Sequence, residues 1–366
     1  MKETGYTVLD DGRVVFRYAG LRNEAPFEVE ITCPITSRVH ENHAGIREQH
    51  RAWARSFKIP PGEEGYQRYC DTRLDLLPAY QLYDLPVEAA IIHSHLMTWF
   101  FVFDDVMDMD HGLENEARSY TEKLCRRHLE ILGGAVAVEG DPCCIHAFSD
   151  FLRKVRLLGG DAFARWYERM VHHLREYVLG AYWESLIGPT TDVNANTAMY
   201  LQVRHMAVGV APCIDLMAVA GKIDGRPLLD NFFIQRLERL AINYSIWVND
   251  RAGLGRDMKR GLGNVIFTLR RDHALSLADA TRMVARMCDA ELQAFFAIEQ
   301  QLPMLIGDDY GRNRAIYEAY ADILKRWMRG LLDWSARSDR YQRLDVDMAL
   351  QNGSVIRRAS HRYFAD

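Results

Sequence analysis

From residue 36 to residue 336, almost every stretch of this chain has the spacing of an amphipathic helix, and this pattern restricts its fold most. Apolar residues recur every three or four positions, and short segments with Gly, Pro or polar residues separate one helical stretch from the next. No internal repeat, low-complexity tract or linker divides the chain. Helices with short connections bury their apolar faces against one another, so the sequence predicts a single all-α domain of about ten helices.

The breakers set the expected ends of these helices. A helix should start at 190–192, carry Gly209 and end near Pro212. The other expected helices cover 43–58, 70–83, 86–108, 114–132, 144–158, 161–183, 230–257, 275–301 and 312–336.

Residues 1–35 have a different pattern. Residues 14–18 and 27–31 alternate apolar and polar side chains, as short strands do, and Gly20 and Pro26 lie between them. We therefore expect an N-terminal extension, irregular or folded as a hairpin, over residues 1–35. The main domain should cover 36–345, and residues 346–366 read as a polar tail.

The composition excludes several classes of protein. A chain that is 48% hydrophobic can bury a large core, and its net charge of -5 gives no reason to expect nucleic-acid binding. The seven cysteines are scattered, without a Cys-x-x-Cys pair, which argues against a disulfide scaffold and a zinc site. The sequence has neither a signal peptide nor an apolar run that approaches the length of a membrane span. We expect a cytoplasmic protein without a membrane span.

An apolar and aromatic run over 97–103 leads directly into a cluster of carboxylates. On a helix, Asp104 and Asp108 lie one turn apart on the same face, with Asp105 beside them. Carboxylates this close repel one another unless a cation lies between them. Oxygen ligands of this kind suit Mg²⁺, which shares its coordination with substrate phosphates. The pattern predicts either a metal site or a solvated, acidic helix end at this place.

A second polar cluster lies near the end of the expected helix 230–257. Asn249, Gly253 and Asp257 share one face of that helix, and Asn249 and Asp257 offer two oxygen ligands for a further cation. Gly253 and Gly255 each cost about 1 kcal/mol of helix stability relative to Ala, and two such costs indicate a reason other than folding. Arg256 and Arg260 add positive charge beside this face. Two metal-competent faces flanked by arginines predict a site for a diphosphate.

These two clusters resemble the motifs of the bacterial class I terpene synthases. Asp104-Asp105-x-x-Asp108 is similar to the aspartate-rich motif of that family. Residues 249–257 read Asn-Asp-x-x-Gly-x-x-Arg-Asp and are similar to its second motif, usually Asn-Asp-x-x-Ser-x-x-Lys/Arg-Glu.

Further residues extend the resemblance beyond the two clusters. Arg204 matches the arginine that senses the diphosphate on the helix before the second motif, and Arg340 with Tyr341 matches the C-terminal Arg-Tyr pair. The elements follow the family's order over residues 30–345. An ordered set of this kind is far more specific than one motif.

The second motif departs from the usual family pattern at two positions. Gly253 stands where the family usually has a Ser or Thr ligand, so a water must take that place, which Mg²⁺ tolerates. Asp257 stands where the family usually has Glu; it is one methylene shorter but remains an oxygen ligand. We interpret both departures as tolerated variation.

The resemblance implies a bundle with a central active-site cavity and a terpene cyclase that uses three Mg²⁺ ions. An isoprenoid diphosphate would ionise there and cyclise to a terpene hydrocarbon or alcohol, with farnesyl diphosphate favoured, geranylgeranyl diphosphate next, and a homodimer compatible with the family. The implied residues are Asp104, Asp105, Asp108, Asn249, Gly253 and Asp257 at the metal; Arg204, Arg256, Arg260, Arg340 and Tyr341 at the diphosphate; and Arg204, Phe100, Phe101, Trp247, Trp334, Val208 and Gly209 in catalysis.

Two other functions stay open. Gly253 motivates a protein that binds isoprenoid diphosphates but has lost catalysis. A prenyl diphosphate synthase shares the bundle and the first motif, but such enzymes usually carry a second Asp-rich motif where this chain has Asn249.

Overall fold

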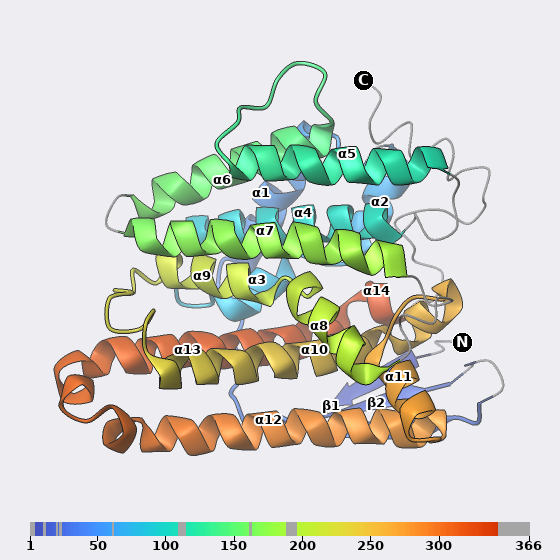
Figure 1. Cartoon of the computed structure of the whole chain (residues 1–366), viewed down its shortest axis with the longest axis vertical. Coiled ribbons are helices and arrows are strands. Elements are labelled where there is room, and N and C mark those ends of the chain that lie inside the picture. The colour runs from blue at the N-terminus through green and yellow to red at the C-terminus, as the bar shows by residue number, and fades with distance from the viewer. Residues whose placement is uncertain are drawn as a thin grey trace.

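The computed structural model describes residues 4–9, 12–19, 21, 24–60, 62–108, 115–160, 163–187 and 196–342. Within these ranges it is the predicted helical bundle with strands at its N-terminal end (Figure 1). The helices are α1 (His43–Ser56), α2 (Glu63–Asp71), α3 (Leu76–Gln81), α4 (Val87–Asp108), α5 (Asn115–Leu132), α6 (Cys143–Gly159), α7 (Ala164–Ile187), α8 (Thr197–Ala207), α9 (Val210–Ala220), α10 (Phe232–Arg260), α11 (Val265–Asp272), α12 (Leu277–Ile306), α13 (Asp308–Arg337) and α14 (Asp339–Gln342).

Most long helices lie where the apolar period places them, but the stretch 70–83 does not form one helix. α2 ends at Asp71 and α3 begins at Leu76, and Arg73 between them has a φ of 54°. α11 was not expected from the sequence, because eight residues are too few to display a clear period. The predicted helix start at 190–192 and the tail at 346–366 lie outside the described residues.

Three antiparallel strands in the order β1-β2-β3 form the N-terminal sheet: β1 (Thr4–Val8), β2 (Arg13–Tyr18) and β3 (Phe27–Thr32). The predicted hairpin is the β2–β3 pair, with Val15 opposite Glu30, and β1 is an additional strand. The sheet packs on the bundle rather than beside it, since β3 contacts α12 and β1 contacts α13. Val14 and Ile31 are fully buried, so one face of the sheet belongs to the core.

The helices lie in roughly parallel rows. Figure 1 shows α5, α6 and α7 on one side, α12 on the other, and α4, α9, α10 and α13 between them. α8, α11 and α14 gather at one end of these rows, which is the end that holds the candidate site.

α8 and α9 are two helices separated by a break at Gly209, and α9 continues past Pro212, where the sequence predicts the helix to end. Gly209 is left-handed, with a φ of 67°, and α9 starts at Val210 directly after it. The stretch Thr197–Ala220 is long and apolar enough to cross a membrane by composition, but 72% of its most apolar window is buried inside the bundle. Its place in the core explains its apolar composition.

Candidate active site

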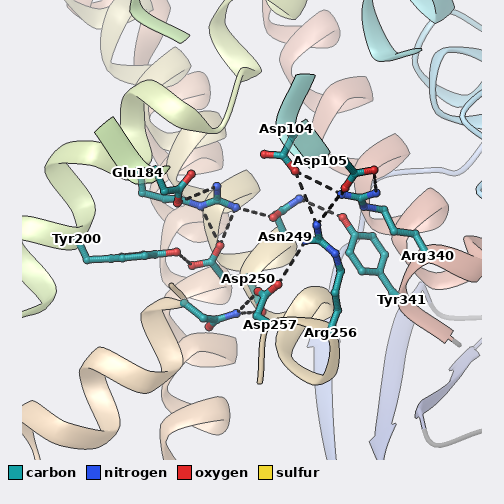
Figure 2. Close-up of polar contacts among 12 residues, drawn as sticks. Asp104, Asp105, Glu184, Tyr200, Asn249, Asp250, Arg256, Asp257, Arg340 and Tyr341 are labelled. Carbon is teal, nitrogen blue, oxygen red and sulfur yellow. Dashed lines mark hydrogen bonds and ion pairs between the residues drawn. The ribbon is translucent and has the colours of Figure 1, made fainter. Parts of the chain in front are cut away.

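A cavity opens at the end of the bundle where α4, α10 and α14 meet. Its inner wall is apolar and aromatic, and its mouth carries the charged side chains shown in Figure 2. The predicted residues that line it are Phe100, Phe101, Asp104, Arg204, Val208, Gly209, Asn249, Gly253, Arg256, Asp257, Trp334, Arg340 and Tyr341. Residues from both sequence clusters and from the C-terminal end therefore meet around one space.

Within the described side chains, two predicted residues, Trp247 and Asp105, are not among those that line the cavity. Trp247 is buried on α10, where a position two residues before Asn249 faces another side of the helix. Its side chain is therefore not among those that line the cavity, and its catalytic role stays a prediction. Asp105 is 5% exposed and lies behind the wall. The side chains of Asp108 and Arg260 are outside the described part, so their roles stay predictions.

Asp104 and Asp105 face two arginines from the C-terminal half of the chain (Figure 2). Arg340 Nη2 lies 3.0 Å from Asp105 Oδ1 and 3.3 Å from Asp104 Oδ2, and Arg256 Nη2 lies 3.3 Å from Asp105 Oδ1. Charge-assisted bonds of this kind are strong and directional when they are shielded from water. The buried Asp105 therefore positions both guanidinium groups, while Asp104 keeps a place on the cavity surface.

Arg204 of α8 is bonded to the second cluster. Its Nη2 donates to Asn249 Oδ1 at 2.6 Å, and its Nε donates to Asp250 Oδ1 at 3.0 Å. Tyr200 donates its hydroxyl to the other oxygen of Asp250 at 2.5 Å. Burial disfavours the charged guanidinium, but the combined interactions with Asp250, Tyr200, Glu184 and Asp104 outweigh it and hold the pKa of Arg204 well above its usual value. Asn249 also donates its Nδ2 to the Tyr341 hydroxyl at 3.2 Å, which links α10 to α14.

The Asp257 carboxylate is held beside Gly253. Asn264 donates its Nδ2 to Asp257 Oδ2 at 2.8 Å, and Arg256 Nη1 lies 3.4 Å from Oδ1. Burial raises the pKa of Asp257 to about 6, while Arg256 and Asn264 act against the rise. A Cβ at position 253 would come within 2.9 Å of Asp257 Oδ2, so the glycine leaves room for this carboxylate.

The oxygen atoms around the mouth fit a hard divalent cation. Asp104, Asn249 and Asp257 all line the cavity and offer only oxygen ligands, the chemistry that Mg²⁺ prefers. Within the described ranges, no three His, Cys, Asp or Glu side chains converge as a closed metal site. A cation held here would therefore complete its coordination with water or phosphate oxygens, as Mg²⁺ usually does.

Aromatic rings form much of the inner wall. Phe100 packs edge-on against Tyr177 with ring centroids 4.3 Å apart, and Phe101 packs edge-on against Trp334 at 5.3 Å. The indole of Trp334 donates to the carbonyl of Thr72 at 3.2 Å, which fixes its orientation. Aromatic faces attract a cation without offering it a nucleophile. A carbocation held here would be stabilised rather than captured.

Five residues of the site were not singled out from the sequence. Two carry a signal that could have revealed them: Tyr200 lies one helical turn before Arg204, and Asp250 stands in the second motif. The others come together only in the folded chain. The five are Tyr177, Glu184, Tyr200, Asp250 and Asn264.

Comparisons with known proteins indicate the same family as the two sequence motifs. A family model described as "Terpene synthase family 2, C-terminal metal binding" matches residues 95–294. Pentalenene synthase of Streptomyces exfoliatus is 27% identical over 340 residues, covering 90% of this chain and 96% of that protein. Germacrene A synthase of Nostoc punctiforme is 26% identical over 319 residues, covering 86% and 94%. The crystal structure of linalool/nerolidol synthase from Streptomyces clavuligerus aligns with a TM-score of 0.72 at 23% identity, covering 82% of this chain and 98% of that one.

Proposed function

Because this chain belongs to the terpene synthase family with a C-terminal metal-binding region, we propose that it is a Mg²⁺-dependent cyclase of farnesyl diphosphate. Its class, a terpene synthase that acts on an isoprenoid diphosphate, follows from the family and its relatives. The proposal depends mainly on one observation: arginines and oxygen ligands surround the opening of a cavity whose inner wall is aromatic. Geranylgeranyl diphosphate is the second candidate substrate.

The charged mouth would bind the diphosphate. A divalent cation, three Mg²⁺ ions in our proposal, would supply charge that stabilises the departing diphosphate. Arg204, Arg256 and Arg340 would exchange part of their bonds to Asp and Asn oxygens for charge-assisted bonds to the diphosphate. Tyr341 would donate its hydroxyl as α14 covers the mouth.

The cavity wall would act on the carbon chain. Phe100, Phe101 and Trp334 present aromatic surface on which the allylic cation can fold and cyclise, a contact worth about 2 kcal/mol when desolvated. A covered mouth excludes water, so that the cation is not quenched before it cyclises. The product would be a cyclic hydrocarbon, or an alcohol where water ends the reaction.

The test is to incubate the purified protein and Mg²⁺ separately with geranyl, farnesyl and geranylgeranyl diphosphate. Extracts are then analysed by gas chromatography and mass spectrometry, and released diphosphate is measured. We expect a cyclic product from farnesyl diphosphate that disappears with EDTA and with Asp257→Asn. Glu122→Gln, a change of a surface carboxylate paired with Arg126, is the matched control and should keep full activity.

Other outcomes identify the other functions. Binding of farnesyl diphosphate without release of diphosphate, with turnover gained only in Gly253→Ser, would indicate a protein that has lost catalysis. A longer diphosphate made only when isopentenyl diphosphate is added would indicate chain elongation. Either result contradicts the cyclase.

We also propose that the catalytic domain spans residues 36–345 and that residues 1–35 are an extension of it. The contacts of β1 and β3 with α13 and α12 support an extension that is packed on the domain and not free of it.

A further inference from the structure

Asn264 lies at the turn between α10 and α11 and is 1% exposed. It is the N-cap residue of α11, where its Oδ1 accepts a hydrogen bond from the amide of Ile266 at 3.0 Å. A capping asparagine needs only this oxygen. Its amide nitrogen can therefore donate hydrogen bonds to other groups.

That nitrogen makes two bonds into the end of α10. Asn264 Nδ2 donates to the carbonyl of Asp250 at 2.6 Å and to Asp257 Oδ2 at 2.8 Å. One side chain thus joins the start of α11, the backbone of the second motif and its last carboxylate. The turn itself is held by the amide of Leu262, which donates to the carbonyl of Asp257 at 2.9 Å.

The bond to Oδ2 decides how the Asp257 carboxylate is presented. Oδ2 lies over Gly253, within 2.9 Å of the place of a Cβ there, and Asn264 holds it at that position. Oδ1 is left on the side of Arg256, a residue that lines the cavity. Without the amide, rotation about the side-chain bonds of Asp257 would be restricted only by the packing around it and by its ion pair with Arg256.

We propose that Asn264 is a positioning residue of the metal site, which fixes Asp257 so that one carboxylate oxygen is presented to the cation. Residues behind metal ligands typically orient them, and their loss costs about 10- to 100-fold in metal affinity. The proposal rests on the proposed function, since it requires that Asp257 binds the metal.

The test compares two asparagines that both cap helices. Asn264→Ser keeps a good capping oxygen but is too short to reach Asp257. Asn231→Ser is the matched control, because Asn231 caps α10 at its far end, accepting from Phe233 and Ile234. Binding of Mn²⁺ is measured by electron paramagnetic resonance with inorganic diphosphate present, together with the melting temperature of each variant.

We expect Asn264→Ser to bind Mn²⁺ about tenfold or more weakly than the unchanged protein, while Asn231→Ser binds it equally well and melts at a similar temperature. Equal Mn²⁺ affinity of Asn264→Ser and the unchanged protein would overturn the positioning role alone. No binding of Mn²⁺ by the unchanged protein would overturn the proposed function and this inference together.

A second variant serves if the serine variant does not fold. Asn264→Asp keeps the size and the capping oxygen but replaces the donating amide with an oxygen that repels Asp257. Weaker Mn²⁺ binding by this variant supports the proposal. Binding as tight as that of the unchanged protein, or tighter, contradicts it.

Discussion

Gly209 is restricted by both its backbone and its neighbours. Its φ of 67° is unfavourable for other residues, and a Cβ there would lie 3.2 Å from the rings of Phe100 and Tyr177. Gly209→Ala should therefore cost about 1–2 kcal/mol of unfolding free energy and displace two rings of the cavity wall. We expect a lower midpoint of urea denaturation and an altered distribution of terpene products.

The control for this change is Gly307→Ala. Gly307 also has a φ of 67°, but nothing lies within 4 Å of its Cβ position. This variant should lose stability and keep the product distribution. If both variants make the same products as the unchanged protein, Gly209 is required only for the backbone conformation and does not shape the cavity wall.

Gly253 and Asp257 are coupled, because a Cβ at 253 would meet the carboxylate at 2.9 Å. Gly253→Ser alone should push Asp257 away from its present position and raise the Mg²⁺ concentration needed for half-maximal activity. Adding Asp257→Glu, which moves the carboxylate further along its side chain, should recover part of the loss. The expected coupling is about 1 kcal/mol, a value typical of residues in contact. Strictly additive effects in this double-mutant cycle would show that the two positions are independent.

At the scale of the element, α9 is apolar except for Asp215, which is fully buried. Nδ1 of His173 lies 2.6 Å from Asp215 Oδ2, and Arg169 of the same helix, α7, lies 3.3 Å from Oδ1. Arg169 also pairs with Glu238 of α10. These bonds fix α9 against α7, and so fix the segment around Gly209 that faces the cavity.

This anchor predicts how stability depends on pH. Burial favours neutral His173, but the bond and charge of Asp215 outweigh it, so the pKa of His173 is raised. The protonated His173 therefore stabilises the folded protein. This contribution is fully present below about pH 6.5, the ordinary pKa of His, and is lost as the pH rises through the pKa that His173 has in the folded protein. His173→Gln should cost about 2 kcal/mol at pH 6 and less at pH 9, as measured by urea denaturation.

The neighbouring histidine provides the comparison for this experiment. His172 is exposed and lies 3.7 Å from Glu176, so His172→Gln should change stability little at either pH. A loss in His173→Gln that does not vary with pH would mean that the imidazole is neutral in the folded protein.

For the molecule as a whole, the features that could be predicted from the sequence are the helix positions, because these depend on local periodicity. α4 and α10 lie where the apolar residues recur, and both motifs stand on them. The contacts made by Asn264 and Asp250 could not be predicted, because they depend on how α8, α10 and α11 pack. Trp247 was expected in catalysis from the resemblance alone, which does not determine the side of α10 that its side chain faces. All seven cysteines are unpaired.

Arg329 joins the two ends of the chain. It is 5% exposed and donates to both oxygens of Asp333 at 2.9 Å, and its Nη1 donates to the carbonyls of Gly12 and Cys33 at 3.1 Å. These bonds tie α13, which carries part of the cavity wall, to the segments that flank β2 and β3. The N-terminal sheet therefore contributes to the stability of the site.

Arg329→Met should cost about 3 kcal/mol of unfolding free energy, because it leaves Asp333 buried with only Arg337 at 3.5 Å and removes the donor of two carbonyls. Arg326→Met, one turn earlier on α13, is the control. Arg326 pairs with the half-exposed carboxylates of Asp84 and Asp322, so its loss should cost about 1 kcal/mol or less. Urea denaturation of both variants measures the difference. A loss of about 1 kcal/mol or less in Arg329→Met would mean that the sheet and α13 are held together by apolar packing, with no net contribution from the buried ion pair.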